Sequence, residues 1–301
     1  MDMKLAVLAA VLAAAPLTGL SQTQSPGAHD KAWWQAVIAD DFTPPEDRPL
    51  SSLTQELSDY LASADPELRD DIAYSLLTQW MYVKRIMPPE LRTALIGDWS
   101  VNLTYRIGEQ GTESVFRRSF SALMLSVAAA LDNEAPYLDK ASFDRLLHAG
   151  LAYLRDERDT RGFEAPNGWM HSVAHTADLL KLLGRSRHLG KTQQSVILTA
   201  ITDKLTRLDH VLVHGEDERL ARAVLSIIAR PDFDMQAFHT FLSALEQARS
   251  EGLPTPAALA ANQNCKNLAV SLYAVLNTDA RELETLHEAR GKTLELLRTM
   301  M

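Results

Sequence analysis

The sequence predicts an all-α fold in which antiparallel helix pairs stack as a HEAT-like α-superhelix of about twelve helices. In one segment after another, apolar residues recur at the i, i+3, i+4, i+7 spacing of an amphipathic helix, and no segment alternates as a half-buried strand does. Short breaks divide the chain into helices of roughly 12 to 20 residues, and helix pairs arrive about every forty residues, as in HEAT-like repeats.

Individual helices are predicted from start signals and apolar stripes. Asp65 is the expected N-cap of a helix with Pro66 in its first turn, and Asp234 is the expected N-cap of a later one. The C-terminal run 281–301 is expected to be helical with an interruption at Gly291. The stripes are Ile72, Leu76, Leu77 and Trp80; Phe120, Leu123, Met124 and Val127; Leu220, Val224, Ile227 and Ile228; Phe238, Phe241, Leu242 and Leu245; and Leu268, Leu272, Val275 and Leu276. The expected breaks are residues 87–89, 133–136, 184–190 and 230–232.

The composition limits the class of partner. The chain has 301 residues, 46% of them hydrophobic, which is enough for the core of one large domain. A formal net charge of −9 argues against a nucleic-acid partner, because a surface that tracks phosphates needs clustered Lys and Arg side chains. We therefore expect a protein, peptide or small-molecule ligand.

The N-terminal sequence predicts export. Residues 5–15 form an apolar run that is too short to span a bilayer and has the length of a signal-peptide core, so residues 1–21 are interpreted as a secretory signal. Residues 22–30 are expected to be a flexible lead-in, and residues 31–301 a single all-helical repeat domain with no transmembrane span after signal removal. The expected location is periplasmic or secreted. The only cysteine, Cys265, leaves no intramolecular disulfide and is expected to be buried.

The segment 156–180 concentrates ionisable side chains at helical spacing. At about 100° per residue, His171, His175 and Asp178 lie within an arc of about 60° on one side of a helix, with Trp169 on the opposite side. Asn167 is the expected N-cap, which places His171 in the first turn, where the positive end of the helix dipole disfavours imidazolium. A neutral imidazole is what a metal ligand or a general base needs.

Two histidines at i and i+4 can bind one metal ion, as in zinc peptidases, but those enzymes carry a glutamate where this chain has Ser172. A peptidase is therefore not predicted. A looser site for zinc or another divalent ion remains open, and it would support a metal-dependent hydrolase in which metal-bound water attacks the substrate. Its candidate ligands are His171 and His175, joined by Asp178, by Asp159 from the loop, or by His210, His214 or Asp217 from the next repeat. The His-x-x-x-His spacing recurs at His210 and His214.

A hydrogen-bonded polar seam between neighbouring helices is the favoured alternative to a metal site. In that interpretation Asp178 or a loop carboxylate fixes the tautomer of one imidazole. The charged loop 156–163 also has two interpretations. Arg161 could hold a carboxylate or phosphate of a substrate near the helix N-terminus. The favoured alternative is an ion-pair network that pins a long turn, with Gly162 at positive φ and Phe163 in the core.

A third hypothesis is an α/α-barrel enzyme that acts on sugars through paired carboxylates. Asp156, Asp159 and Glu164 could supply them, but no spacing rule selects these residues. Aromatic residues make up only 7% of the chain, so stacking platforms for sugars are few.

The motif GW-x-H-x-x-AH-x-ADLL, preceded by D-x-RGF and followed by EDERLA, resembles the bacterial family of domain of unknown function 2785 (DUF2785). The resemblance covers residues 156–222. It implies an all-helical, HEAT-like domain with no assigned activity, so it transfers no catalytic role. The resemblance also implies that many relatives are cytosolic, so the predicted leader is a departure from the family and points to an exported branch.

The leading functional hypothesis is an exported binding or interaction scaffold whose concave surface is lined near its centre by the segment 156–180. The metal-dependent hydrolase is the alternative. The candidate ligand-binding residues are Asp159, Arg161, Trp169, His171, His175 and Asp178.

Overall fold

The computed structural model describes residues 29–248 and 254–300. The predicted signal, residues 1–21, lies outside the described residues, as do residues 22–28 of the predicted lead-in. The first described residues are anchored to the helices that follow. The His29 ring hydrogen-bonds to Glu56 at 2.8 Å, and Asp30 accepts a hydrogen bond from the backbone N–H of Trp33 at the start of the first helix.

Helices make up nearly all of the secondary structure in the described part of the chain. The first elements are α1 (Lys31–Ala39), α2 (Leu50–Tyr60), η1 (Glu67–Tyr74), α3 (Ser75–Thr78), η2 (Gln79–Val83), α4 (Pro89–Asn102), α5 (Ser114–Glu134) and α6 (Lys140–Asp156). After them come β1 (Phe163–Glu164), β2 (Gly168–Trp169), α7 (Ser172–Leu183), α8 (Lys191–Arg207), α9 (Glu216–Ile228), α10 (Met235–Gln247), α11 (Pro256–Thr278) and α12 (Glu284–Met300). The elements η1, α3 and η2 form one unbroken helix with π-helical turns at both ends.

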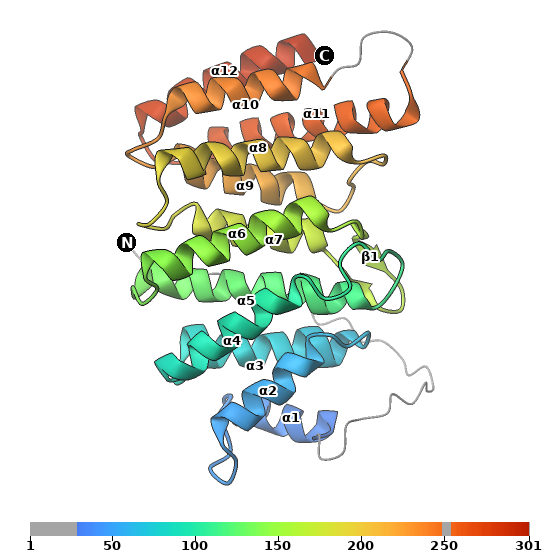
Figure 1. The fold of residues 1–301 in the computed structure, drawn as a ribbon, viewed down its shortest axis with the longest axis vertical. Helices are drawn as coiled ribbons and strands as arrows, with labels where there is room; N and C mark the ends of the chain where they lie inside the picture. The colour runs from blue at the N-terminus through green and yellow to red at the C-terminus, as the bar shows by residue number, and fades with distance from the viewer. Residues whose placement is uncertain (1–28, 249–253, 301) are drawn as a thin grey trace.

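The helices stack in sequence order from one end of the molecule to the other (Figure 1). In one layer α5, α7, α9 and α11 each contact the next helix, and in the other layer α6, α8, α10 and α12 do so. Contacts therefore run mainly between neighbours along the stack, as in repeat proteins. The predicted all-α class is confirmed, and this packing is consistent with the predicted HEAT-like superhelix.

The predicted apolar stripes form the core. All of their residues are buried except Leu123, which is partly buried. Asp234 caps α10 as predicted, because its carboxylate accepts the N–H of Gln236 at 3.0 Å. Cys265 is fully buried, and burial raises the pKa of its thiol to about 12. Each of the four predicted breaks coincides with a gap between two helices.

Two expectations about local structure are wrong. The helix α12 runs unbroken through Gly291, where an added Cβ would meet nothing within 4 Å. A glycine on the solvent side of a helix weakens it by about 1 kcal/mol without ending it. The chain also contains a β-hairpin, β1 with β2, whose two-residue strands are too short to produce a visible alternation.

The helix α5 is the central helix of the core. By length and composition it is the one described helix that could cross a membrane, but 83% of its apolar window is buried inside the protein. It contacts α4, α7, α3 and η2. Its apolar length is therefore explained by packing against neighbours on several sides.

Truncation of Leu179 tests whether α7 is part of this core. Leu179 is fully buried and lies close to Gly150 of α6. We expect Leu179→Ala to lower the free energy of unfolding by about 2–5 kcal/mol, because it removes buried methyl groups and leaves a cavity. The control Leu259→Ala removes a side chain that is 54% exposed and should change stability by less than about 0.5 kcal/mol in urea titrations. Equal effects of the two substitutions would contradict the packing.

Candidate functional site

The segment before α7 is a β-hairpin and not a helix start. The strands β1 and β2 pair antiparallel, and the ladder continues to His171, whose N–H donates to the carbonyl of Arg161 at 3.2 Å. Gly168 has φ +78°, a conformation that glycine adopts without steric cost. The helix α7 begins at Ser172, so the prediction of Asn167 as its N-cap is wrong. Gly168 pairs with Glu164, so the turn comprises residues 165–167. A short Pro-Asn-Gly run between two aromatic residues is a hairpin signal, and it could have revealed this turn from the sequence.

His171 lies at the junction between the hairpin and α7. Its backbone is in the left-handed region (φ 50°, ψ 34°), which non-glycine residues rarely adopt. Its ring stacks on Trp169, with 4.1 Å between centroids and 4° between planes. Trp169 therefore does not lie opposite His171 as predicted, because it belongs to β2 and not to the helix. The Nδ1 atom of His171 is buried and has no hydrogen-bond partner in the described part of the chain. His171 therefore combines a rare backbone conformation with an unsatisfied polar atom, and both features are more common at functional sites than elsewhere.

Both histidines of the predicted pair are neutral at pH 7. Burial is the largest cause that lowers the pKa of His171 to about 4, and the nearby Arg219 and His214 add to it. Burial also holds the pKa of His175 well below its usual value, followed by the effects of His171 and Arg219. The predicted neutral state therefore results mainly from burial, and not from the helix dipole.

His175 forms a hydrogen-bonded seam between α7 and α5. The hydroxyl of Ser119 donates to the carbonyl of Met170, so it accepts from Nδ1–H of His175 at 2.8 Å. This bond fixes the tautomer of the imidazole. Ser119 is fully buried and its proton is already donated, so it is not an activated nucleophile. The rings of His171 and His175 lie 5.7 Å apart.

The other predicted ligands are dispersed. Asp178 pairs with Lys181 at 2.6 Å and with Arg219, and with neither histidine. In the loop between α8 and α9, Nε2 of His210 hydrogen-bonds to Thr160 at 2.8 Å, whereas His214 lies edge-on to Trp169. Asp217 accepts a hydrogen bond from α11. Among the described residues, no group of three or more His, Cys, Asp or Glu could hold a metal ion.

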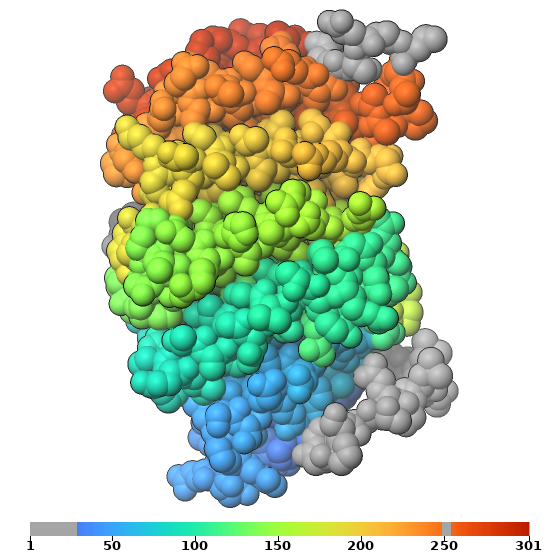
Figure 2. Space-filling model, viewed as in Figure 1, coloured from blue at the N-terminus to red at the C-terminus, as the bar shows by residue number. Residues whose placement is uncertain are grey.

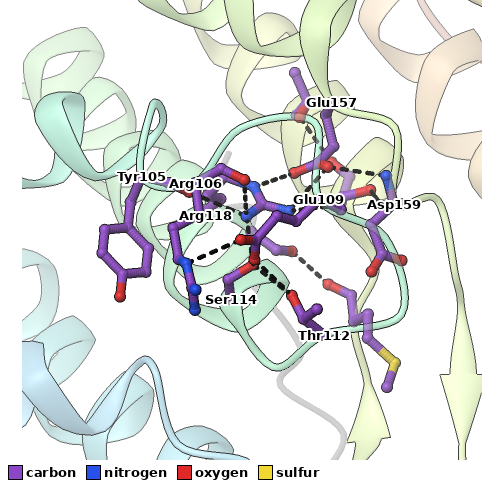
Figure 3. A network of polar contacts seen from close by, with 12 residues as sticks. Tyr105, Arg106, Glu109, Thr112, Ser114, Arg118, Glu157 and Asp159 are labelled. Atoms are coloured by element: carbon purple, nitrogen blue, oxygen red, sulfur yellow. Dashed lines mark hydrogen bonds and ion pairs between the residues drawn. The ribbon is translucent and has the colours of Figure 1, made fainter.

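The loop before the hairpin is fixed by a buried ion pair. Arg118 of α5 donates to the carboxylate of Glu157 at 2.5 and 3.0 Å, and the two side chains are 0% and 3% exposed (Figure 3). Arg118 also donates to Ser114 and to three carbonyl oxygens within residues 105–109. Burial acts to lower the pKa of Arg118, but the hydrogen bonds and charge of Glu157 outweigh it and raise the pKa. This pair joins the α4–α5 loop to the α6–β1 loop.

Asp159 and Arg161 extend the same network. Asp159 is 2% exposed and accepts from the N–H of Gly111 at 2.9 Å and from Arg161 at 2.8 and 2.7 Å. Arg161 also donates to Glu164 and to the carbonyl of Thr112. Because the guanidinium donates to Asp159, Glu164 and the carbonyl of Thr112, the geometry matches an ion-pair network that pins the turn better than a substrate clamp.

Gly162 and Phe163 differ from their expected roles. Gly162 does not have a positive φ, and the requirement for glycine comes from space, since an added Cβ would lie 2.1 Å from Nδ1 of His214. Phe163 is 48% exposed and does not fill the core. It lies edge-on to Trp169, itself 41% exposed, so the hairpin presents two aromatic rings to solvent.

A large open groove lies between α6 and α8. Its volume is about 1610 Å³, and its lining includes Leu151 and Ala152 of α6 and Val196 and Ala200 of α8. The loop 107–110 and the C-terminal ends of both helices line it as well. The two helices form neighbouring bands on one face of the molecule (Figure 2). We call this feature the α6–α8 groove.

A smaller hollow of about 550 Å³ adjoins the groove. It lies between residues 158–164 and residues 210–214. Gln110, Arg158 and His210 line both features, so the two are neighbours. The predicted candidates Asp159, Arg161, His210 and His214 therefore line a surface depression, whereas His175 and Asp178 lie in the helical core.

Sequence reasoning missed several residues that build this region. Their hydrogen bonds reach partners 39 to 56 positions away in the chain, and the residues are Arg118, Glu157, Ser119 and Lys204. Arg69 donates to the carbonyl of Asn167, which is 98 positions away. Local spacing carries no information about such partners. One signal was available, because Arg118 shares a helical face with Val115, Ala122 and Leu125, all fully buried. A charged residue on an apolar face implies a buried partner.

The family assignment agrees with the motif. A family model described as protein of unknown function (DUF2785) matches residues 103–274, more than half of the chain. The chain belongs to the DUF2785 family. The matched part of this DUF2785 protein includes the hairpin, the Arg118–Glu157 pair and both hollows. No curated protein and no solved structure matches the chain.

The neutral state of His171 predicts a pH-dependent stability. The folded DUF2785 protein keeps His171 unprotonated down to about pH 4, whereas the unfolded chain takes up the proton near pH 6.5. Stability should therefore fall as the pH drops from 6.5 to 4, by at most about 1.4 kcal/mol per pH unit for this group. His171→Gln, measured by urea unfolding across this range, should lose less stability than wild type.

The control for this titration is His287→Gln, which removes an exposed histidine. Its side chain is 53% exposed, so the pH dependence should stay close to that of the wild type. Parallel curves for wild type and His171→Gln would mean that His171 is not held neutral by the fold.

Two glycine substitutions separate close packing from backbone effects. We expect Gly162→Ala to destabilise the protein by about 1–3 kcal/mol, because the new methyl group displaces His214. Gly291→Ala should stabilise α12 by up to about 1 kcal/mol, because its Cβ points into open space. Thermal unfolding measures both. A gain of stability in Gly162→Ala would refute the contact with His214.

Proposed function

We propose that this protein is a binding scaffold that holds a polypeptide segment of a partner in the α6–α8 groove. The supporting observation is the size and openness of the groove. At about 1610 Å³ it exceeds the roughly 300–1000 Å³ of typical small-molecule pockets, and it lies open on one face. Leu151, Ala152, Val196 and Ala200 offer apolar contacts, and charged side chains surround them. Apolar contact with a polar rim is the usual composition of a recognition surface.

The proposal moves the binding surface away from the helix that carries the histidines. Residues 172–180 are all buried, so this part of the segment 156–180 is not available to a partner. Residues 158–164 remain relevant because they line the adjoining hollow. The rings of Phe163 and Trp169 provide a second, aromatic contact beside it.

The alternative enzymes lack a supporting arrangement in the described residues. The hydrolase needs a third metal ligand near His171 and His175, and no such group of three is present there. The sugar-active enzyme needs a free pair of carboxylates. Asp159 and Glu164 are both held by Arg161, and Asp156 by Arg155. We therefore favour the scaffold.

Export remains part of the proposal. It rests on the apolar run 5–15 followed by a break at Pro16 and Gly19. A scaffold with one buried cysteine needs no disulfide to fold in the periplasm or outside the cell.

Site-specific photo-crosslinking tests the binding surface. A benzoylphenylalanine at Val196, which is 46% exposed in the groove, should give a discrete crosslinked species in producing cells, and mass spectrometry should map one segment of the partner. Ala200→Trp fills the groove and should reduce this species about tenfold, since it blocks contacts without touching the core ion pair.

The matched control places the same probe at Val101 in α4, which is 71% exposed and lines neither hollow. It should give no such species. Equal crosslinking from the two positions, or a species that persists in Ala200→Trp, would eliminate the groove as the binding surface. Circular dichroism confirms that each variant is folded.

A further inference from the structure

One end of the α6–α8 groove contains a buried lysine without a carboxylate partner. Lys204 of α8 is 6% exposed and lines the groove. Its Nζ donates to the backbone carbonyl of Glu157 at 2.5 Å. It forms no ion pair with any residue that the structure describes. A buried ammonium that is paired only with a carbonyl retains most of its charge unbalanced.

The two carboxylates whose charges act on Lys204, those of Glu157 and Asp156, already have other partners. The carboxylate of Glu157 accepts two hydrogen bonds from Arg118 and one from the N–H of Asp159. Asp156 is held by Arg155 at 2.6 Å. Burial lowers the pKa of Lys204 to about 8, and Glu157 and Asp156 oppose that change. The lysine is therefore still mostly protonated at pH 7.

A second cation lies at the same end of the groove. Arg158 is exposed, lines both the groove and the adjoining hollow, and makes no hydrogen bond or ion pair with the described residues. Its charge and that of Lys204 both lower the pKa of Asp156, after the larger effect of Arg155. The charges of three cations, Arg155, Arg158 and Lys204, thus act on the single carboxylate of Asp156. With the Arg118–Glu157 pair neutral, this end of the groove carries an excess of positive charge.

We propose that this end of the α6–α8 groove binds the carboxylate groups of an acidic peptide through Lys204 and Arg158, with the exposed amide of Gln110 as a further donor. The inference rests on the proposed function, and it specifies the chemistry of the bound segment. The two cations and the amide come from α8, from the residues after α6, and from the loop 107–110, so three elements contribute donors to the same groove.

A carboxylate fits this place better than a phosphate. The polypeptide proposed above carries carboxylates on its Asp and Glu side chains, whereas it would carry a phosphate only after covalent modification. Asp203 and Glu109, which line the same groove, are paired with Arg207 and Arg106 and so do not neutralise Lys204 or Arg158. Asp209 contacts the ring of His210 and leaves one negative charge at this end, against the two positive charges of Lys204 and Arg158.

Stabilisation of α6 is the alternative role for Lys204. A cation at a helix C-terminus is favourable, and the carbonyl that Lys204 binds belongs to the residue that ends α6. That role explains a loss of stability in Lys204→Met. It does not explain Arg158, which has no hydrogen-bond or ion-pair partner in the described chain. A loss of peptide affinity in Arg158→Gln therefore tests binding, whereas a loss of stability in Lys204→Met tests the role at the end of α6.

The test uses an array of random twelve-residue peptides and the full-length protein. We expect the bound peptides to be enriched in Asp and Glu, and the affinity of a selected acidic peptide to fall about tenfold in Arg158→Gln and in Lys204→Met. Arg158→Gln should leave stability unchanged. Arg298→Gln, an exposed change in α12 away from the groove, should leave the affinity unchanged. Acetate should compete with the peptide more strongly than inorganic phosphate does at equal charge concentration.

The outcomes separate this inference from the proposed function. Bound peptides without acidic enrichment, or an acidic preference that survives in Arg158→Gln, would overturn the inference while leaving the scaffold intact. Stronger competition by phosphate would overturn the choice of carboxylate. If no peptide binds and the crosslink at Val196 is also absent, the proposed function itself fails.

Discussion

The buried ion pair between Arg118 and Glu157 supports the whole candidate region. Moving two charges out of water costs several kcal/mol per ion, and the structure offsets this by giving the guanidinium and the carboxylate a full set of hydrogen bonds. The pair fixes the backbone of residues 105–109 and of Glu157 at once. The ion pair also fixes the position of Lys204 at one end of the α6–α8 groove, because Lys204 donates to the backbone carbonyl of Glu157.

Two adjacent residues of α5 position both halves of the region. Arg118 holds the loop before the hairpin, and Ser119 holds the end of the hairpin through the carbonyl of Met170 and the ring of His175. Arg69 of η1 makes a further contact, because its guanidinium donates to the carbonyl of Asn167 in the hairpin turn at 2.9 Å. The same guanidinium lies over two phenylalanine rings of α5. The hairpin is therefore fixed through its contacts with the core, while the rings of Phe163 and Trp169 and the residues 164–166 are exposed.

The sequence predicted the helices well and the site only in part. The spacing of apolar residues was enough to predict the helices, because most helical stability comes from burying one apolar face. The residues of that face recur at fixed short intervals in the sequence. The sequence placed His171 and His175 near each other, and their rings lie 5.7 Å apart. It did not predict the conformation before them, because the Pro-Asn-Gly run can signal either a hairpin or the start of a helix. The partners of Arg118 and Lys204 are distant in the chain, so no local rule could identify them.

The polar groups around His175 and those around Lys204 and Arg158 differ in charge and in exposure. This difference is the reason why the binding site is proposed at Lys204 and Arg158. His175 and Ser119 are neutral, buried and hydrogen-bonded to each other, which is what a seam between two helices needs. Beside Lys204 and Arg158 the charge is unbalanced and faces a groove that is open to solvent. A fold does not gain stability from an unpaired cation at its surface, and a buried unpaired ammonium opposes folding. In the proposed complex, Lys204 keeps its contact with the C-terminus of α6, and the carboxylates of the bound peptide balance the charge that the fold leaves at Lys204 and Arg158.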